Sequence, residues 1–188
     1  DLAFTLNTRL EGKPSRLAVV ATSVEDLAQK FSHALGRLSD PQARQIKDNG
    51  GIYFFDQPLK GKLAFLFPGE GAQYANMLLD LCLHFPEVRR CFDLADRALR
   101  HSSRDVLPSD VIFPRSILWQ AERERVEQIL WSQDGAVEAV MICNWAMSTL
   151  LQRLEIQPDV IAGHSTGDYS AMLASNIIAL DEQQAGEV

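Results

Sequence analysis

Short apolar runs alternate along the chain with longer segments whose apolar residues recur every three or four positions. Residues 16–22, 52–55 and 63–67 have the length and composition expected of strands, and the last run is apolar throughout, as in a buried strand. Another short apolar run covers residues 159–162. Strands that alternate with helical segments predict an α/β fold with a parallel sheet in its core.

Two helices are predicted in detail. Ser23 can cap the first, whose apolar face is formed by residues at helical spacing: Leu27, Phe31, Leu35 and Leu38. Pro86 suits the first turn of the second, whose buried face is formed in the same way by Val88, Cys91, Phe92, Ala95 and Leu99.

The remaining segments are read more coarsely. A short helix is expected from Asp40-Pro41 to about residue 50, and helical structure from residue 72 onward, with a helix over residues 76–84. The prolines and polar residues of 101–116 predict a loop. Further helices are expected at 120–131, 135–154 and 166–176, and residues 181–188 begin another element.

The pentapeptide Gly163-His164-Ser165-Thr166-Gly167 follows the apolar run at 159–162 and precedes a predicted helix. A serine on a sharp turn from strand to helix has an exposed hydroxyl, and flanking glycines allow the neighbouring backbone to approach closely. The N–H of Thr166 is then directed to where an oxyanion would form. This context makes Ser165 a candidate nucleophile, although a simple glycine-rich turn has the same pattern.

A second glycine-flanked loop, Pro68-Gly69-Glu70-Gly71, ends the apolar run at 63–67. Such a loop can direct a backbone N–H, here that of Glu70, toward a ligand atom at the edge of the sheet. The two loops together would supply both halves of an oxyanion hole. Taken alone, the loop at 68–71 is equally compatible with an ordinary turn at the end of a strand.

In this order, the segments 65–73 (Phe-Leu-Phe-Pro-Gly-Glu-Gly-Ala-Gln) and 163–169 (Gly-His-Ser-Thr-Gly-Asp-Tyr) resemble the acyltransferase domains of fatty-acid and polyketide synthases. The resemblance covers most of the chain after residue 60. Residues 1–60 look like the small α/β linker subdomain that precedes the acyltransferase in type I polyketide synthases. Residues 61–188 then resemble the amino-terminal part of the acyltransferase domain, with a hydrolase-like parallel sheet and a nucleophile elbow.

The resemblance implies a ping-pong acyl transfer. A serine, here Ser165, takes an acyl group, often malonyl, from coenzyme A as an ester and passes it to the phosphopantetheine thiol of an acyl carrier protein. The backbone N–H groups of Glu70 and Thr166 would bind the oxyanion, and supporting positions around them would be Gly163, His164, Gly167 and Gln73. No permanently bound cofactor or metal is implied. The expected partners are the carrier protein, an adjacent ketosynthase domain and the remainder of the acyltransferase domain.

The chain departs from the family pattern at two positions. The family usually has glutamine where this chain has Glu70, and glutamate where it has Asp168. A carboxylate at residue 70 that turns toward the site would oppose both a developing oxyanion and a malonyl carboxylate. The charge of the acyl group is therefore left open by the sequence.

A serine nucleophile needs a positioned base, most often histidine. His164 is adjacent to Ser165, but successive side chains at a strand end point in opposite directions. His33, His84 and His101 fit surface or interface positions better. In the family the base histidine and an arginine that pairs with the malonyl carboxylate both follow the serine. We therefore expect the chain to be a piece of a longer acyltransferase that is inactive by itself.

Two other functions remain open. A serine hydrolase of the α/β class shares the elbow, but usually builds its oxyanion hole from a glycine-rich loop preceded by histidine, and the loop at 68–71 differs from that pattern. A non-catalytic role, as a structural linker and half-domain that contacts a condensing domain, is the other.

Composition and charge limit the classes of protein to which the chain can belong. With 46% hydrophobic and 23% charged residues the chain resembles ordinary globular proteins, and its net charge of −7 argues against generic binding of nucleic acid. No apolar stretch approaches the length of a membrane span, so a cytoplasmic protein is expected.

The three cysteines have no metal-ligand spacing and fit reduced core positions. The densest basic cluster is formed by Arg89, Arg90, Arg97, Arg100 and Arg104, which fits a solvated helix face or a patch for a carrier protein.

Overall fold

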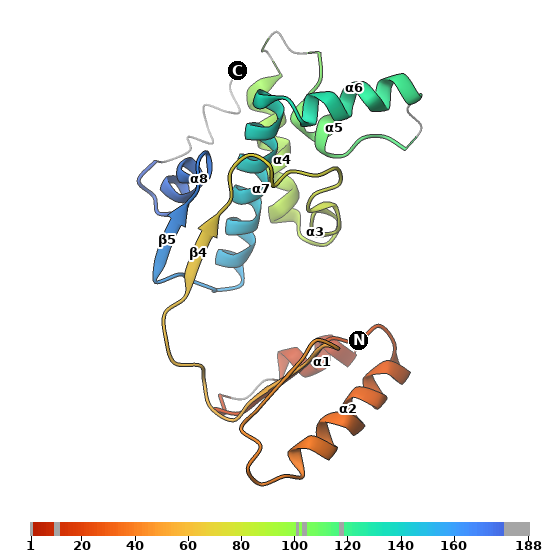
Figure 1. Ribbon diagram of the computed structural model, residues 1–188, viewed down its shortest axis with the longest axis vertical. Coiled ribbons are helices and arrows are strands. Elements are labelled where there is room, and N and C mark those ends of the chain that lie inside the picture. The colour runs from red at the N-terminus through yellow and green to blue at the C-terminus, as the bar shows by residue number, and fades with distance from the viewer. Residues whose placement is uncertain (1, 10–11, 101, 103–104, 117–118, 179–188) are drawn as a thin grey trace. The chain divides into compact units, whose positions relative to one another are not determined.

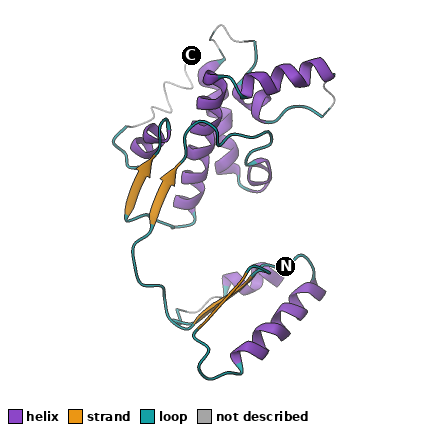
Figure 2. Cartoon of the chain, viewed as in Figure 1, coloured by secondary structure: helices purple, strands orange, loops and turns teal. Residues whose placement is uncertain are grey.

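The computed structural model of the chain describes residues 2–9, 12–100, 102, 105–116 and 119–178 (Figure 1). The chain divides into two compact units, Asp1–Gly61 and Lys62–Val188. Helices and strands occur in both units (Figure 2), and parallel pairing is found in the second, so the fold is of the α/β kind.

The first unit contains helix α1 (Leu2–Thr8), strand β1 (Arg16–Val19), helix α2 (Val24–Leu38) and strands β2 (Gln45–Asp48) and β3 (Ile52–Phe55). The strands form an antiparallel sheet in the order β1-β3-β2. Its core is small: Ala34 of α2 packs with Ile46 and Ile52 of the sheet, all nearly inaccessible to solvent. Burying one face of an amphipathic helix on a three-stranded sheet stabilises both.

The predicted cap of α2 is confirmed. The Ser23 hydroxyl accepts a hydrogen bond from the Asp26 N–H at 3.1 Å. The predicted apolar face is partly wrong. Leu27 and Leu38 are half-buried, but Phe31 and Leu35 are exposed, and the contact with the sheet is centred on Ala34. Because Ala34 is small, the helix can approach the sheet closely at that residue. In this orientation the larger side chains of Phe31 and Leu35 lie outside the contact.

The helix expected after Asp40 is wrong, because these residues form β2 instead. Ile46 is buried against the core, and β2 pairs with β3 from Gln45↔Phe55 to Asp48↔Ile52. Gly51, with φ of +95°, closes the hairpin by donating its N–H to the Asp48 carbonyl. A short loop that ends in a glycine at positive φ is a common hairpin connection, and here it overrides the local preference for helix.

The second unit places two parallel strands beside a group of helices. Strands β4 (Ala64–Phe67) and β5 (Val160–Gly163) pair in register from Ala64↔Val160 to Phe67↔Gly163. Figure 1 shows them side by side, with α7 (Gln133–Arg153) next to them and α8 (Gly167–Ala174) directly after β5. The other helices are α3 (Leu79–His84), α4 (Pro86–Leu99), α5 (Pro108–Ile112) and α6 (Gln120–Leu130).

The core of this unit lies between α4, α5, α6 and α7. It contains Val88, Ile112, Leu130 and Ala146, each 2% exposed or less. The predictions for α4, α6, α7 and α8 are confirmed to within a few residues, and α7 buries residues on much of its circumference, as its apolar composition predicts. None of the three cysteines is in a disulfide. Cys91 and Cys143 are buried, and burial raises the pKa of the Cys143 thiol to about 12.

Two local predictions in this unit are wrong. The segment expected to be a loop at 101–116 contains α5, which begins at Pro108 and buries Val111 and Ile112; apolar burial outweighs the loop-like composition. Residues 72–78 are not helical. Asn76 and Leu78 have φ of 63°, outside the helical region, and the Asn76 N–H donates to the Ile112 carbonyl at 2.7 Å. The element expected at 181–188 lies outside the described residues.

Candidate active site

The two motif loops begin at the same edge of the parallel pair. Phe67, the last residue of β4, pairs with Gly163, the last residue of β5. The His164 N–H donates to the Phe67 carbonyl at 3.0 Å, which extends the pairing one residue into the second loop. The segments at 68–71 and 164–166, far apart in the sequence, therefore lie next to each other.

Ser165 occupies a tight turn between β5 and α8. Its φ is 56°, in the left-handed region that non-glycine residues rarely adopt. The turn is closed on both sides of the serine, by the Gly167 N–H to the His164 carbonyl at 2.9 Å and by the Asp168 N–H to the Ser165 carbonyl at 3.0 Å. This backbone holds the side chain of Ser165 on the exposed side of the turn.

Glycines permit the two loops to touch. A Cβ on Gly167 would overlap the carbonyl of Phe67 and lie 2.8 Å from the carbonyl oxygen of Pro68, and a Cβ on Gly163 would overlap the backbone of Gly167. A Cβ on Gly69 would lie 2.6 Å from the His164 carbonyl oxygen and 2.9 Å from the Ser165 Cβ. Separations below 3.0 Å essentially never occur for real Cβ atoms, so backbone would have to move. Close contact between the loops thus depends on these positions having no side chain.

The side chain of Glu70 reaches across to the serine turn. Its Oε2 atom accepts hydrogen bonds from the Ser165 hydroxyl at 2.9 Å and from the Thr166 hydroxyl at 3.1 Å. The pKa of the Glu70 carboxyl lies below its ordinary value of 4.5, mainly because its own backbone N–H donates to it and also because of these two hydroxyls. Glu70 is therefore ionised at neutral pH, and it places a negative charge at the serine.

The other residues predicted for the site have different positions. His164 is exposed, and its backbone, rather than its ring, takes part in the turn. Gln73 is 4% exposed; its Oε1 accepts from the Gly71 N–H at 2.8 Å and its Nε2 donates to the Leu130 carbonyl at 3.4 Å. These two hydrogen bonds connect the loop that contains Glu70 with α6, and neither of them involves Ser165. Asp168 is exposed in the first turn of α8.

Asn144 was not singled out in the sequence, yet it joins three parts of the site. It is 8% exposed on α7, and its Nδ2 donates to the Pro68 carbonyl at 3.0 Å and to the hydroxyl of Ser170, on α8, at 3.1 Å. An amide in an otherwise apolar helix was the available indication, because buried polar side chains are nearly always hydrogen-bonded.

Two of the other histidines lie among the described residues. His33 belongs to the first unit, where its Nε2 is 3.5 Å from Oδ2 of Asp48, and His84 is exposed at the end of α3. His101 and Arg104 lie outside the described residues. Of the predicted basic cluster, Arg89 is 3.9 Å from the Asp93 carboxylate and Arg97 donates to the Asp93 carbonyl.

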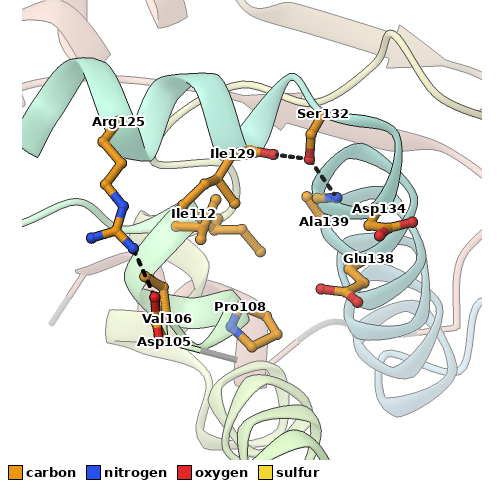
Figure 3. Close-up of a pocket in the computed structure, with 12 residues that line it drawn as sticks. Asp105, Val106, Pro108, Ile112, Arg125, Ile129, Ser132, Asp134, Glu138 and Ala139 are labelled. Carbon is orange, nitrogen blue, oxygen red and sulfur yellow. Dashed lines mark hydrogen bonds and ion pairs between the residues drawn. The ribbon is translucent and has the colours of Figure 1, made fainter. Parts of the chain in front are cut away.

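A separate hollow of about 290 Å³ opens between α5, α6 and α7 (Figure 3). On one side Arg125 is paired with Asp105 at 3.1 Å; on the other, Ser132 accepts from the Gly135 N–H and donates to the Ile129 carbonyl. The Ser132 bonds join the end of α6 to the first turn of α7. The residues that line this hollow do not include Ser165.

Two features are absent from the residues that the structure describes. No group of three or more histidines, cysteines, aspartates or glutamates could hold a metal ion there. In the same residues, no helix has both the length and the apolar character needed to cross a membrane.

Comparison with known proteins relates the chain to polyketide synthases. Preu5, a highly reducing polyketide synthase of Preussia isomera, is 34% identical over 179 residues, which make up 95% of this chain and 6% of that protein. The crystal structure of the acyltransferase domain from the second module of the salinomycin polyketide synthase matches with a TM-score of 0.61 and 26% identity, over 96% of this chain and 37% of that one. Over nearly its whole length, the chain is thus similar to a segment of polyketide synthases and to a solved acyltransferase domain.

Malonyl transacylases are also similar to the chain. The malonyl CoA-acyl carrier protein transacylase of Bacillus subtilis (strain 168) is 29% identical over 121 residues, 64% of this chain and 33% of that protein. A malonyl-transacylase solved in complex with its type II polyketide acyl-carrier protein matches with a TM-score of 0.52 and 26% identity, over 66% of this chain and 34% of that one. No family model matches the chain. The chain spans 6% of the length of Preu5, and so only a small part of that polyketide synthase.

Proposed function

We propose that Ser165 is the nucleophile of an acyl transfer from acyl-coenzyme A to the phosphopantetheine thiol of an acyl carrier protein. The observation that carries this proposal is the exposed Ser165 at φ of 56°, on a turn between a parallel strand and a helix. A nucleophile elbow in a hydrolase-like sheet would have this arrangement. The relatives whose names include malonyl-coenzyme A make a malonyl group the first acyl group to test.

The reaction has two steps. The Ser165 Oγ attacks the thioester carbonyl carbon, so that an O–C bond forms, the C–S bond breaks, and coenzyme A leaves as the thiol after the Oγ proton passes to a base. The pantetheine thiol of the carrier then attacks the ester and regenerates the hydroxyl. The described residues bonded to the Ser165 hydroxyl include no histidine. By resemblance to the family, we assign the base, and an arginine for a malonyl carboxylate, to a part of the domain that follows the serine.

The two loops supply candidate donors for the oxyanion of the tetrahedral intermediate. Thr166 is the N-cap of α8, so its N–H lies at the positive end of the helix, and Gly69 packs directly against the same turn. The second donor is the N–H of Glu70, which is shared with the Glu70 carboxylate in the present arrangement. Loss of one such donor typically costs about a hundred- to a thousandfold in rate.

The face of the sheet that carries Leu66 supports the proposal that more of the domain packs here. Leu66 is 76% exposed and Val160 is 49% exposed, although parallel strands are normally covered on both faces. The matched acyltransferase structure is longer than this chain, which spans 37% of it. We assign this apolar face to the remainder of the acyltransferase domain.

The partners follow from the same proposal. A carrier protein would deliver the pantetheine thiol to the edge of the sheet where Ser165 is exposed, and a related transacylase has been solved with its carrier protein bound. The first unit, residues 1–61, would be the linker subdomain next to a ketosynthase. No cofactor beyond the two thioester carriers is required.

The test is covalent labelling of the full-length protein that contains this chain. After brief incubation with malonyl-coenzyme A and proteolysis, mass spectrometry should find a malonyl adduct on the peptide with Ser165. Ser165→Ala should abolish the adduct, whereas Ser175→Ala, which removes an exposed hydroxyl at the end of α8, should keep it. Adding holo-carrier protein should transfer the label.

Other outcomes would favour the other functions. Release of free malonate without carrier and without a lasting adduct would favour a serine hydrolase. A full-length protein in which Ser165 accepts no acyl group from any acyl-coenzyme A would contradict the acyl-transfer proposal and leave a structural role for this segment.

A further inference from the structure

The Glu70 carboxylate is a fixed part of the serine site. Four groups donate to it: the Ser165 hydroxyl, the Thr166 hydroxyl, and the backbone N–H groups of Glu70 and Thr166. None of these donors is cationic, so the hydrogen bonds orient the carboxylate without neutralising its charge. When Ser165 is acylated it can no longer donate a proton, but the bonds from Thr166 and from the backbone remain available.

Simple geometry limits the distance between this charge and any acyl group on Ser165. Glu70 Oε2 is 2.9 Å from the serine Oγ. In a malonyl ester the carboxylate carbon is three bonds from Oγ, so it lies no more than about 4 Å from it. With the Thr166 bond retained, the two carboxylates are then no more than about 7 Å apart. An acetyl group has no atom at that position and no charge.

We propose that Glu70 is a specificity-determining residue that disfavours acyl groups carrying a carboxylate and favours uncharged acyl groups of similar size. The inference rests on the proposed acyl transfer and narrows its substrate class. Two like charges at this separation repel each other, and both lie where solvent and salt screen them in part. The expected discrimination from Glu70 is therefore about three- to tenfold, measured as the ratio of malonyl to acetyl transfer.

The experiment is a competition in the full-length protein. Equal concentrations of malonyl- and acetyl-coenzyme A are mixed with the enzyme, and the two adducts on the Ser165 peptide are compared by mass at early times. Glu70→Gln keeps the shape of the side chain and removes its charge. It should raise the malonyl-to-acetyl ratio about three- to tenfold. Glu155→Gln removes an exposed carboxylate that precedes β5, at the opposite end of the strand from Ser165, and should leave the ratio unchanged.

Salt separates a charge effect from a change of shape. Raising the ionic strength from about 20 mM to about 0.5 M should raise the malonyl-to-acetyl ratio of the wild type toward that of Glu70→Gln, because it shortens the range of the repulsion. The variant itself should respond much less.

The failures can be told apart. If Ser165 is acylated but Glu70→Gln leaves the ratio unchanged, the specificity role of Glu70 is wrong and the acyl transfer stands. If neither donor acylates Ser165, the proposed function fails, and this inference fails with it.

Discussion

The two loops that meet at the edge of the parallel strands are held in different ways. The turn at 163–167 is fixed by backbone packed on backbone, because a side chain at Gly167 would overlap the end of β4. The loop at 68–71 is fixed mainly by side chains, with Asn144 bonded to the Pro68 carbonyl and Gln73 bonded to the Gly71 N–H. Where backbone packs on backbone, only glycine fits at the contact positions. Where side chains hold a loop, each of them can be substituted separately.

The difference matches the tasks proposed for the two loops. A nucleophile must be placed within a fraction of an ångström, and a turn made of interlocking backbone provides that accuracy. The opposite loop carries Glu70, whose side chain projects into the site from a more adjustable support. If Ser165 and Glu70 have the proposed roles, the serine turn fixes the nucleophile and the loop at 68–71 influences substrate preference.

Gly167→Ala should give the largest effect on stability. The new Cβ would overlap the carbonyl of Phe67, so β4 and α8 must separate, and we expect a loss of about 3 kcal/mol or more. The measurement is urea unfolding followed by tryptophan fluorescence, since all three tryptophans lie after residue 62 and report on the second unit alone.

Gly71→Ala is the matched control from the other loop. Gly71 has φ of +100°, but a Cβ there meets no atom within 4 Å. Only backbone strain is added, so the expected loss is about 1–2 kcal/mol. Equal losses for the two variants would contradict the contrast between the loops.

Asn144→Leu should have an intermediate effect. It leaves the Pro68 carbonyl and the Ser170 hydroxyl without their donor, which typically costs about 1–3 kcal/mol. Because the loop at 68–71 is loosened, labelling of Ser165 should slow as well. Ser170→Ala removes only one of the two bonds and should cost less in the same urea titration; a larger loss from Ser170→Ala would show that Asn144 does not tie the loop.

The smallest effect concerns pH. The pKa of Glu70 is lowered in the folded protein, so its contribution to stability is present above the ordinary carboxyl value of 4.5 and is lost as pH falls through the lower folded value. Comparing wild type with Glu70→Gln, the difference in urea midpoint between pH 7 and about pH 3.5 should be slightly larger for the wild type. An identical pH response would mean that the bonds to Ser165 and Thr166 do not persist in solution.

The sequence predicted the parts of the site that depend on local backbone. An apolar run followed by a glycine-flanked serine is enough to indicate a strand, a turn and a helix, and these were found at β5, Ser165 and α8. The backbone of 72–78 was not predictable in the same way, because its course depends on Gln73 and Asn76, whose partners Leu130 and Ile112 are distant in the chain.

The directions of the Glu70 and Asn144 side chains could not be predicted from the sequence either. Glu70 at the tip of a loop could have pointed into solvent, and its contact with Ser165 arises only because Gly69 and Gly167 bring the two loops together. Likewise, the polar residue Asn144 looks unfavourable within an apolar helix until the Pro68 carbonyl and Ser170 are placed beside it. Such contacts depend on packing between segments that are distant in the sequence, and the local pattern of residues does not predict that packing.

The left-handed backbone at Ser165 has an evolutionary consequence. A residue with a Cβ is disfavoured in that conformation by about 1–2 kcal/mol, a cost that glycine does not have. For stability alone, glycine would be the better residue at this position. If Ser165 performs the proposed chemistry, a lineage that lost the activity would gain stability by replacing the serine with glycine. The residue at position 165 in any descendant would then indicate whether the proposed chemistry persists.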